Sequence, residues 1–268
     1  MSTIFRVSKI SLIYILFIVW RHGDRAPIYI YPNDPNKEDA WPQRFSELTT
    51  IGMAQHFYLG KFLGKRYIDE LNFLSPQYKS EEIYVISTDT NRTIQSAISN
   101  MIGMFGQRER LGIDYPNIVG WPSAFLPIPI HNYEFKKDPI GYARHNCKRT
   151  IELFKLLEKT PEYKKLNQSN AEFLTKISEY AGTQITLNNL WGFIETANIE
   201  KTHGLIPPEW VLQILPEALK IDIQLINLQM GLGIAPFMGI NFESEIPRML
   251  GGPFLWELIE RMEKKASE

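Results

Sequence analysis

The stretch from Arg21 to Pro27, Arg-His-Gly-Asp-Arg-Ala-Pro, constrains this chain more than any other feature. It places two arginines and a histidine within five positions, directly after an apolar run from Ile10 to Trp20. Cations held this close repel one another unless an anion lies among them. The planar guanidinium of arginine matches a phosphate group in bidentate geometry. We therefore predict a phosphate-binding loop over 21–27, preceded by a buried strand over 12–20.

The histidine inside this loop, His22, is a candidate nucleophile. Neighbouring guanidinium groups disfavour the imidazolium, which predicts a pKa of His22 below the reference value of about 6.5. A neutral imidazole is nucleophilic at mildly acid pH. The alternative is a solvated turn after a strand, in which Gly23 supplies only backbone freedom. An isolated Arg-His-Gly would favour the solvated turn. A second group of phosphate-binding residues elsewhere in the chain would favour the functional interpretation.

A second strand-to-helix junction supplies such a site. Residues 82–87 have the composition of a strand, and the polar stretch from Thr88 to Thr93 is typical of a helix start. Arg92 falls in the first helical turn, where free backbone amides and the helix dipole favour anions. A single arginine at a helix start is more often a surface residue. The position of Arg92 directly after a predicted strand favours a functional role instead. Arg92 thus joins Arg21 and Arg25 as a candidate phosphate ligand.

The composition gives no sign of nucleic-acid, membrane or metal binding. The net charge of −1, from 29 basic and 30 acidic residues, gives no general affinity for nucleic acid or a membrane surface. The apolar run is too short to span a bilayer, and no small-residue cleavage site follows it, so we find no clear cleavable signal peptide. The single cysteine, Cys147, excludes an internal disulfide. No carboxylate cluster has ligand spacing, so neither a metal nor a cofactor is predicted.

Helices dominate the rest of the expected structure. A proline-containing loop over 28–45, called the prolyl loop below, precedes a helix from Thr49 or Thr50 to about Tyr67. Its apolar side is predicted to carry Met53, Phe57, Leu63 and Tyr67. Residues 141–217 have helical patterns with short breaks, and a separate helix is expected over 216–230. A loop over 231–246 leads to a last helix that begins with Pro253 at its first position.

These elements suggest two parts of the chain. Residues 1–115 and 216–268 would form a discontinuous α/β core. Residues 116–215 would form a helical cap inserted into it. The chain of 268 residues is long enough for a core with such an insertion.

Several motifs together resemble a known family. Residues Arg21 to Pro27 resemble the Arg-His-Gly-x-Arg-x-Pro signature of the histidine acid phosphatases, and 87–93 resemble the second arginine motif, Ser-Thr-Asp-x-x-Arg-Thr. Further matching segments follow in the family's order: Trp41-Pro42-Gln43, 48–53, 65–67 and 251–255. The chain is similar to the prostatic and lysosomal acid phosphatase branch from about Leu12 to its end. Several ordered motifs are a far stronger signal than one.

The resemblance implies a three-layer α/β core with an inserted helical cap. It also implies acid phosphatase activity on small phosphomonoesters through a phosphohistidine on His22, with Arg21, Arg25 and Arg92 holding the phosphoryl oxygens. No metal or other cofactor is needed for that chemistry. By resemblance the protein would enter the secretory pathway and be lysosomal or extracellular. The oligomeric state stays open, with a homodimer as one alternative.

One family motif has no counterpart in this chain. The family carries a His-Asp pair on a later strand, where the histidine binds phosphate and the aspartate protonates the leaving alcohol. None of the five histidines here precedes an aspartate, so we expect a core that lacks the C-terminal His-Asp strand. Asp24 and Asp89 are the nearest substitute donors by sequence, although structural roles are expected for both.

Three functional readings follow. The first is an acid phosphatase. The second is a catalytically impaired phosphate-binding relative, or an incomplete splice form or gene model. The third, an enzyme similar to phosphoglycerate mutases, is disfavoured by the Arg-His-Gly-Asp-Arg-Ala-Pro form of the loop and by the large helical insertion.

Overall fold

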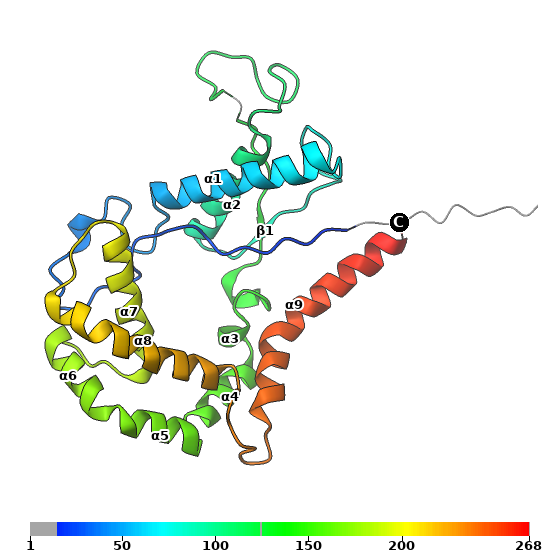
Figure 1. The fold of residues 1–268 in the computed structure, drawn as a ribbon. Coiled ribbons are helices and arrows are strands. Elements are labelled where there is room, and N and C mark those ends of the chain that lie inside the picture. The colour runs from blue at the N-terminus through cyan, green and yellow to red at the C-terminus, as the bar shows by residue number, and fades with distance from the viewer. Residues whose placement is uncertain (1–14, 124, 268) are drawn as a thin grey trace, which may run out of the picture.

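Helices dominate the computed structural model, which describes residues 15–123 and 125–267 (Figure 1). Its sheet has two short parallel strands, β1 (Ile86–Ser87) and β2 (His131–Asn132), with Ile86 opposite His131 and Ser87 opposite Asn132. The α/β class is as expected. Within the described residues the sheet has only these two strands, so the three-layer arrangement stays a prediction.

One predicted strand is absent from the described residues, and another is shorter than predicted. The strand expected over 12–20 does not form in its described part, residues 15–20, and residues 12–14 lie outside the described residues. Apolar side chains alone do not make a strand, which needs a neighbour for its backbone groups. Ile15 and Val19 are instead exposed. The strand expected over 82–87 is reduced to its last two residues, because only these pair with β2.

The first helix pair consists of α1 (Thr50–Gly64), continued by a π-helical turn (Lys65–Glu70), and α2 (Asn91–Phe105). Thr49 caps α1 as predicted, since its Oγ1 accepts a hydrogen bond from the Gly52 amide at 3.1 Å. The predicted apolar side of α1 was right at Leu63, which is buried, and wrong at Met53, which is exposed. The other buried positions of the helix include Gly52, His56 and Gly60. The reason is a close helix crossing, which only glycine permits.

The two helices cross at a pair of glycines. A Cβ on Gly60 would lie 1.9 Å from the Asn100 carbonyl oxygen, and one on Gly103 would lie 2.0 Å from the Phe57 oxygen. Below this crossing, Ala97, Met101 and Phe105 of α2 are buried with Leu63 of α1. These buried residues make the inward face of α2.

A group of helices follows, drawn as an arc below α1 and α2 in Figure 1. In chain order they are α3 (Ala143–Asn146), α4 (Lys148–Leu157), α5 (Pro161–Ser169), α6 (Ala171–Ala181), α7 (Leu187–Thr202) and α8 (Glu209–Gln229). Buried residues of α5 to α8 make one apolar cluster with Tyr31 of the prolyl loop. Short 3-10 turns lie at Glu38–Ala40 and Phe135–Lys137.

Two predicted boundaries near prolines were wrong. The helices expected on either side of Pro216 are one helix, α8, with the proline inside it. Leu212, whose carbonyl loses its partner to the proline, is exposed, so water can solvate that carbonyl. The last helix, α9 (Phe242–Ser267), begins eleven residues before Pro253. Phe242 and Ile246 are buried with Leu153 and Leu157 of α4, and this packing anchors the helix start inside the predicted loop.

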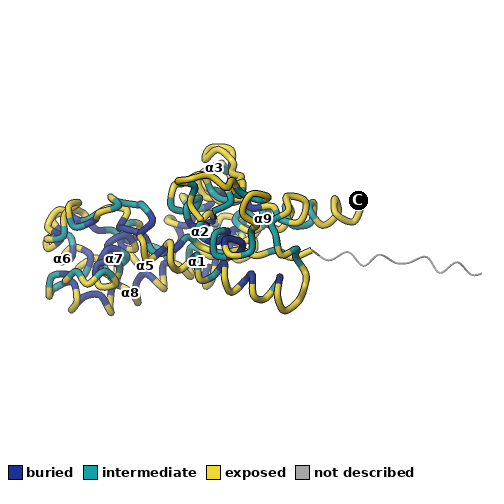
Figure 2. The backbone as a smooth tube through the Cα atoms, turned by 90° about the horizontal axis from the view of Figure 1, so that it is seen from above, coloured by how far each residue is buried: buried dark blue, intermediate teal, exposed yellow. Residues whose placement is uncertain are grey.

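Burial is uneven along the chain (Figure 2). Buried backbone is concentrated in the α5–α8 group and between α1 and α2, whereas most of α9 beyond Ile246 is exposed or half-buried. The division into a core of residues 1–115 and 216–268 and a cap of residues 116–215 stays a prediction.

Candidate active site

The loop 21–27 is held by the segment that leads into α1. Arg25 and Leu48 form an isolated antiparallel bridge. The Ala26 amide donates to the Glu47 carbonyl at 3.0 Å, and the Thr49 amide donates to the Asp24 carbonyl at 3.0 Å. These bonds satisfy the loop backbone and fix its path beside the start of α1.

Gly23 lets the loop lie against α1. A Cβ on this residue would lie 2.4 Å from the Gly52 carbonyl oxygen, and one on Gly52 would lie 2.1 Å from the Asp24 oxygen. The Gly23 amide donates to Ser96 Oγ of α2 at 3.1 Å. Close approach, rather than a left-handed backbone, is therefore the reason for glycine here. The loop is locked between the two helices, which argues against a solvated turn.

His22 has a defined tautomer in its neutral form. Its Nδ1 lies 2.7 Å from the Gly23 carbonyl oxygen, and a carbonyl only accepts, so Nδ1 carries the hydrogen. The lone pair of a neutral ring is then on Nε2. Burial of the half-buried ring lowers the pKa of His22 below 6.5, and the charges of Arg21, Arg92 and Arg25 lower it further. The direction is the predicted one, but burial is the larger cause.

The charges of Arg25 and Arg92 both act on the His22 ring and on each other. The Arg25 side chain is 4% exposed, and its Nη1 donates to the Ala26 carbonyl at 3.0 Å. Arg92, in the first turn of α2, donates from Nη1 to Ser46 Oγ at 2.9 Å. Burial and the charge of Arg25 lower the pKa of Arg92. Two like charges that act on each other in a partly buried site favour an anion between them.

A carboxylate from α7 reaches the same place. Glu195 Oε2 lies 2.6 Å from Arg25 Nη2, and Glu195 Oε1 lies 3.5 Å from Arg21 Nη2. Arg21 itself is 72% exposed. The structure thus brings His22 and its three predicted arginines together and adds Glu195, which the sequence did not indicate. Glu195 is 170 residues from Arg25 along the chain, and no local pattern links them.

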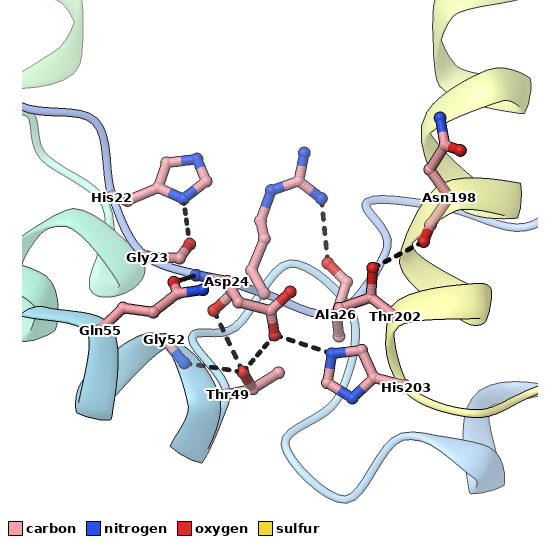
Figure 3. A network of polar contacts seen from close by, with 11 residues as sticks. His22, Gly23, Asp24, Ala26, Thr49, Gly52, Gln55, Asn198, Thr202 and His203 are labelled. Carbon is pink, nitrogen blue, oxygen red and sulfur yellow. Dashed lines mark hydrogen bonds and ion pairs between the residues drawn. The ribbon is translucent and has the colours of Figure 1, made fainter.

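A second network links the loop to the end of α7 (Figure 3). The Asp24 carboxylate accepts from Thr49 Oγ1 at 2.5 Å and pairs with His203 Nε2 at 2.7 Å. Figure 3 shows this carboxylate turned toward Thr49 and His203, away from the His22 ring. Asp24 therefore fits the structural role expected of it. Asp89 is exposed and accepts from the Asn132 side chain at 2.9 Å.

Two other histidines support the loop without entering it. His203 is the C-cap residue of α7, and its ring makes an edge-to-face contact with Trp41 at 5.2 Å between ring centroids. His56 is buried, and its Nε2 donates to the Arg21 carbonyl at 3.0 Å.

Residues 15–123 and 125–267 contain no group of three or more histidine, cysteine or acidic side chains placed to hold a metal ion. Among the described helices, none has the length and apolarity that crossing a membrane requires.

Comparison with known proteins identifies the class. A family model described as the histidine phosphatase superfamily (branch 2) matches residues 13–268. The chain therefore belongs to the histidine phosphatase superfamily, as its motifs predicted.

Within that superfamily the chain is similar to acid phosphatases. It is 34% identical to the lysosomal acid phosphatase of Rattus norvegicus over 246 residues, which are 91% of this chain and 55% of that protein. It is 32% identical to the prostatic acid phosphatase of Homo sapiens over 252 residues, 92% of this chain and 61% of the relative. The apo form of Hafnia alvei phytase superposes with a TM-score of 0.48 at 15% identity, over 78% and 58% of the two chains. The chain spans about half the length of the lysosomal relatives.

Proposed function

We propose that this protein hydrolyses small phosphomonoesters through a phosphohistidine formed on His22. The observation that carries the proposal is the state of the His22 ring. Its Nδ1–H is donated to the Gly23 carbonyl, so the neutral ring holds its lone pair on Nε2, within the field of three arginines. A neutral imidazole beside cations that attract phosphate has the properties of a nucleophile for phosphoryl transfer.

The reaction has two displacements. In the first, the lone pair of His22 Nε2 forms a bond to phosphorus as the bond to the leaving oxygen breaks. The imidazole ring then carries a positive charge, which the Gly23 carbonyl stabilises through Nδ1–H. In the second, water attacks phosphorus, the N–P bond breaks, and phosphate and neutral His22 are released after the water loses its proton.

The arginines would stabilise charge on the transferring group. The charges of Arg25 and Arg92 act on each other, and Arg21 is largely exposed. Charge on the equatorial oxygens of the transition state is best stabilised by guanidinium groups already in place, because they need no reorganisation. Such preorganisation is supported here by the bonds of Arg25 to Ala26 and of Arg92 to Ser46.

Protonation of the leaving oxygen sets the substrate preference. Loss of general-acid assistance typically costs about 10²–10⁴-fold in rate. The loss costs least when the leaving group is acidic. None of the five histidines of this chain is followed by aspartate, so the family's proton donor has no counterpart in these 268 residues. We therefore expect the 268-residue chain to act on aryl phosphates in preference to alkyl phosphates. Equal rates on both would show that another group supplies the proton.

The names of the relatives suggest a location. Two are called lysosomal and prostatic acid phosphatase, and we propose that this protein also enters the secretory pathway and acts on a small phosphomonoester there.

Trapping of the intermediate tests the proposed function. The protein would be mixed with a radiolabelled aryl phosphate, quenched in alkali, and digested to locate the label. We expect an alkali-stable, acid-labile phosphoryl group on His22. His22→Asn should abolish it, and His145→Asn, at an exposed histidine of α3, should not. Phosphate binding without labelling of His22 would support the impaired phosphate-binding relative instead.

A further inference from the structure

Glu195 occupies the place where an anion is expected. Its two carboxylate oxygens contact Arg25 and Arg21, at 2.6 Å and 3.5 Å. Its charge also acts on Arg92. The side chain is 13% exposed, although it lies on a helix far from the loop in sequence. One carboxylate is thus shared among all three arginines that the proposed function assigns to phosphate.

Arg25 offers a phosphate group little other access. Nη1 of Arg25 is engaged by the Ala26 carbonyl, Nη2 is engaged by Glu195, and the whole side chain is 4% exposed. Carboxylate and phosphate oxygens are both acceptors, and like charges at contact distance repel. An incoming phosphate group would therefore have to take over the contact that Glu195 holds.

The helix that carries Glu195 is fixed on either side of it. Thr196 Oγ1 donates to the Tyr29 carbonyl at 2.9 Å, and the Tyr29 hydroxyl donates to the Asn189 carbonyl at 3.1 Å. A Cβ on Gly192 would lie 2.2 Å from that hydroxyl oxygen. With the backbone of α7 held this closely, displacement of Glu195 requires rotation of its side chain and leaves the helix in place.

We propose that Glu195 is an internal competitor for the phosphate site, which substrate phosphate displaces from Arg25 and Arg21. This inference rests on the proposed function and extends it. In the free protein the carboxylate offsets the repulsion among the arginines. In the complex the carboxylate lowers the affinity for phosphate, and it favours release of the product when phosphate leaves.

Binding of inorganic phosphate tests this inference. Titration calorimetry would compare the intact chain with Glu195→Gln, which keeps the shape of the side chain and removes its charge. We expect Glu195→Gln to bind phosphate about tenfold more tightly, the size of one charge-assisted contact. Glu217→Gln is the matched control, since it removes a carboxylate of α8 that is 51% exposed and forms an ion pair with Lys220. The control should bind as the parent does.

The direction of the change separates the alternatives. If Glu195 instead holds the arginines in position for phosphate, Glu195→Gln will bind more weakly, and the inference is overturned; unchanged affinity overturns it as well. Glu195→Asp, with a shortened carboxylate, provides a second variant if the first unfolds, and it should also bind more tightly than the parent. If neither the parent nor any variant binds phosphate, the proposed function fails together with this inference. If the parent binds phosphate and neither variant binds it more tightly, only the inference about Glu195 is overturned.

Discussion

His22 lies half-buried beside three arginines, and each of these surroundings opposes its protonation. Burial is the larger cause of the lowered pKa, because the imidazolium loses more hydration than the neutral ring. The bond from Nδ1–H to Gly23 acts in the other direction, since a carbonyl stabilises the charged ring. The balance leaves the ring neutral over a wider pH range than a free histidine.

This balance predicts the pH dependence of the first chemical step. A pKa below 6.5 means that the nucleophilic form persists as the pH falls through 6.5 and is lost only at more acid pH. We expect an NMR titration of the His22 ring to have its midpoint below 6.5. Arg92→Met should raise that midpoint, because it removes one of the repelling charges. Lys61→Met, on the exposed side of α1, is the control and should leave the midpoint unchanged. A midpoint above 6.5 in the parent would contradict this account.

At the scale of the elements, the crossing of α1 and α2 positions both halves of the phosphate site. Thr49 and Gly52 at the start of α1 contact the loop, while Ser96 and Arg92 at the start of α2 contact it from the other side. The spacing between these helix starts depends on how closely the helices cross at Gly60 and Gly103.

We predict that Gly60→Ala separates the helices and destabilises the protein. The new Cβ would lie 1.9 Å from a backbone oxygen of Asn100, a contact that no side-chain rotation relieves. Overpacking of this kind costs about 1–3 kcal/mol or more. Urea unfolding measures the loss. Gly251→Ala is the control, because nothing lies within 4 Å of its Cβ on α9, and alanine there should be neutral or stabilising by about 0.5–1 kcal/mol. Equal stabilities of the two variants would show that the crossing tolerates separation.

Local signals predicted the starts of these helices but not their packing. Thr49 as a cap and the helix start near Arg92 follow from the side chains of a few adjacent residues. The buried face of α1 did not follow, because glycine carries no hydropathy signal and its contact depends on a second helix. Pro253 indicated a helix start that packing of Phe242 and Ile246 placed earlier.

In the candidate site, too, contacts that depend on packing could not be predicted from the sequence. His22 and its three arginines were predictable because each lies in a short recognisable motif. Glu195 and His203 were not, because they meet the loop only through the placement of α7, 170 and 179 residues away from their partners.

At the scale of the whole molecule, a buried pair of carboxyl groups joins the prolyl loop to the helical group. Asp34 is 1% exposed and Glu200 of α7 is fully buried. The Asn36 backbone amide donates to Asp34 and its side chain donates to Glu200, at 2.9 Å and 2.8 Å. The charge of Asp34 also raises the pKa of Glu200, because two carboxylates held close together repel each other. The link between loop and helices is therefore sensitive to pH.

The last prediction concerns the pH dependence of stability. Burial raises the pKa of Glu200 from 4.5 to about 7 and also raises the pKa of Asp34. Between those two pH values the folded state binds the proton more tightly than the unfolded state does. The contribution to stability is thus fully present below pH 4.5 and is lost as the pH rises toward 7.

Glu200→Gln, whose amide donates as the protonated acid would, should match the parent at pH 4.5. At pH 7.5 it should be more stable by about 1–3 kcal/mol, or a melting temperature roughly 3–10 °C higher. Thermal melts at both pH values measure this, with exposed Glu209→Gln as the control. A variant less stable than the parent at pH 7.5 would show that Glu200 is held there as a favourable charge.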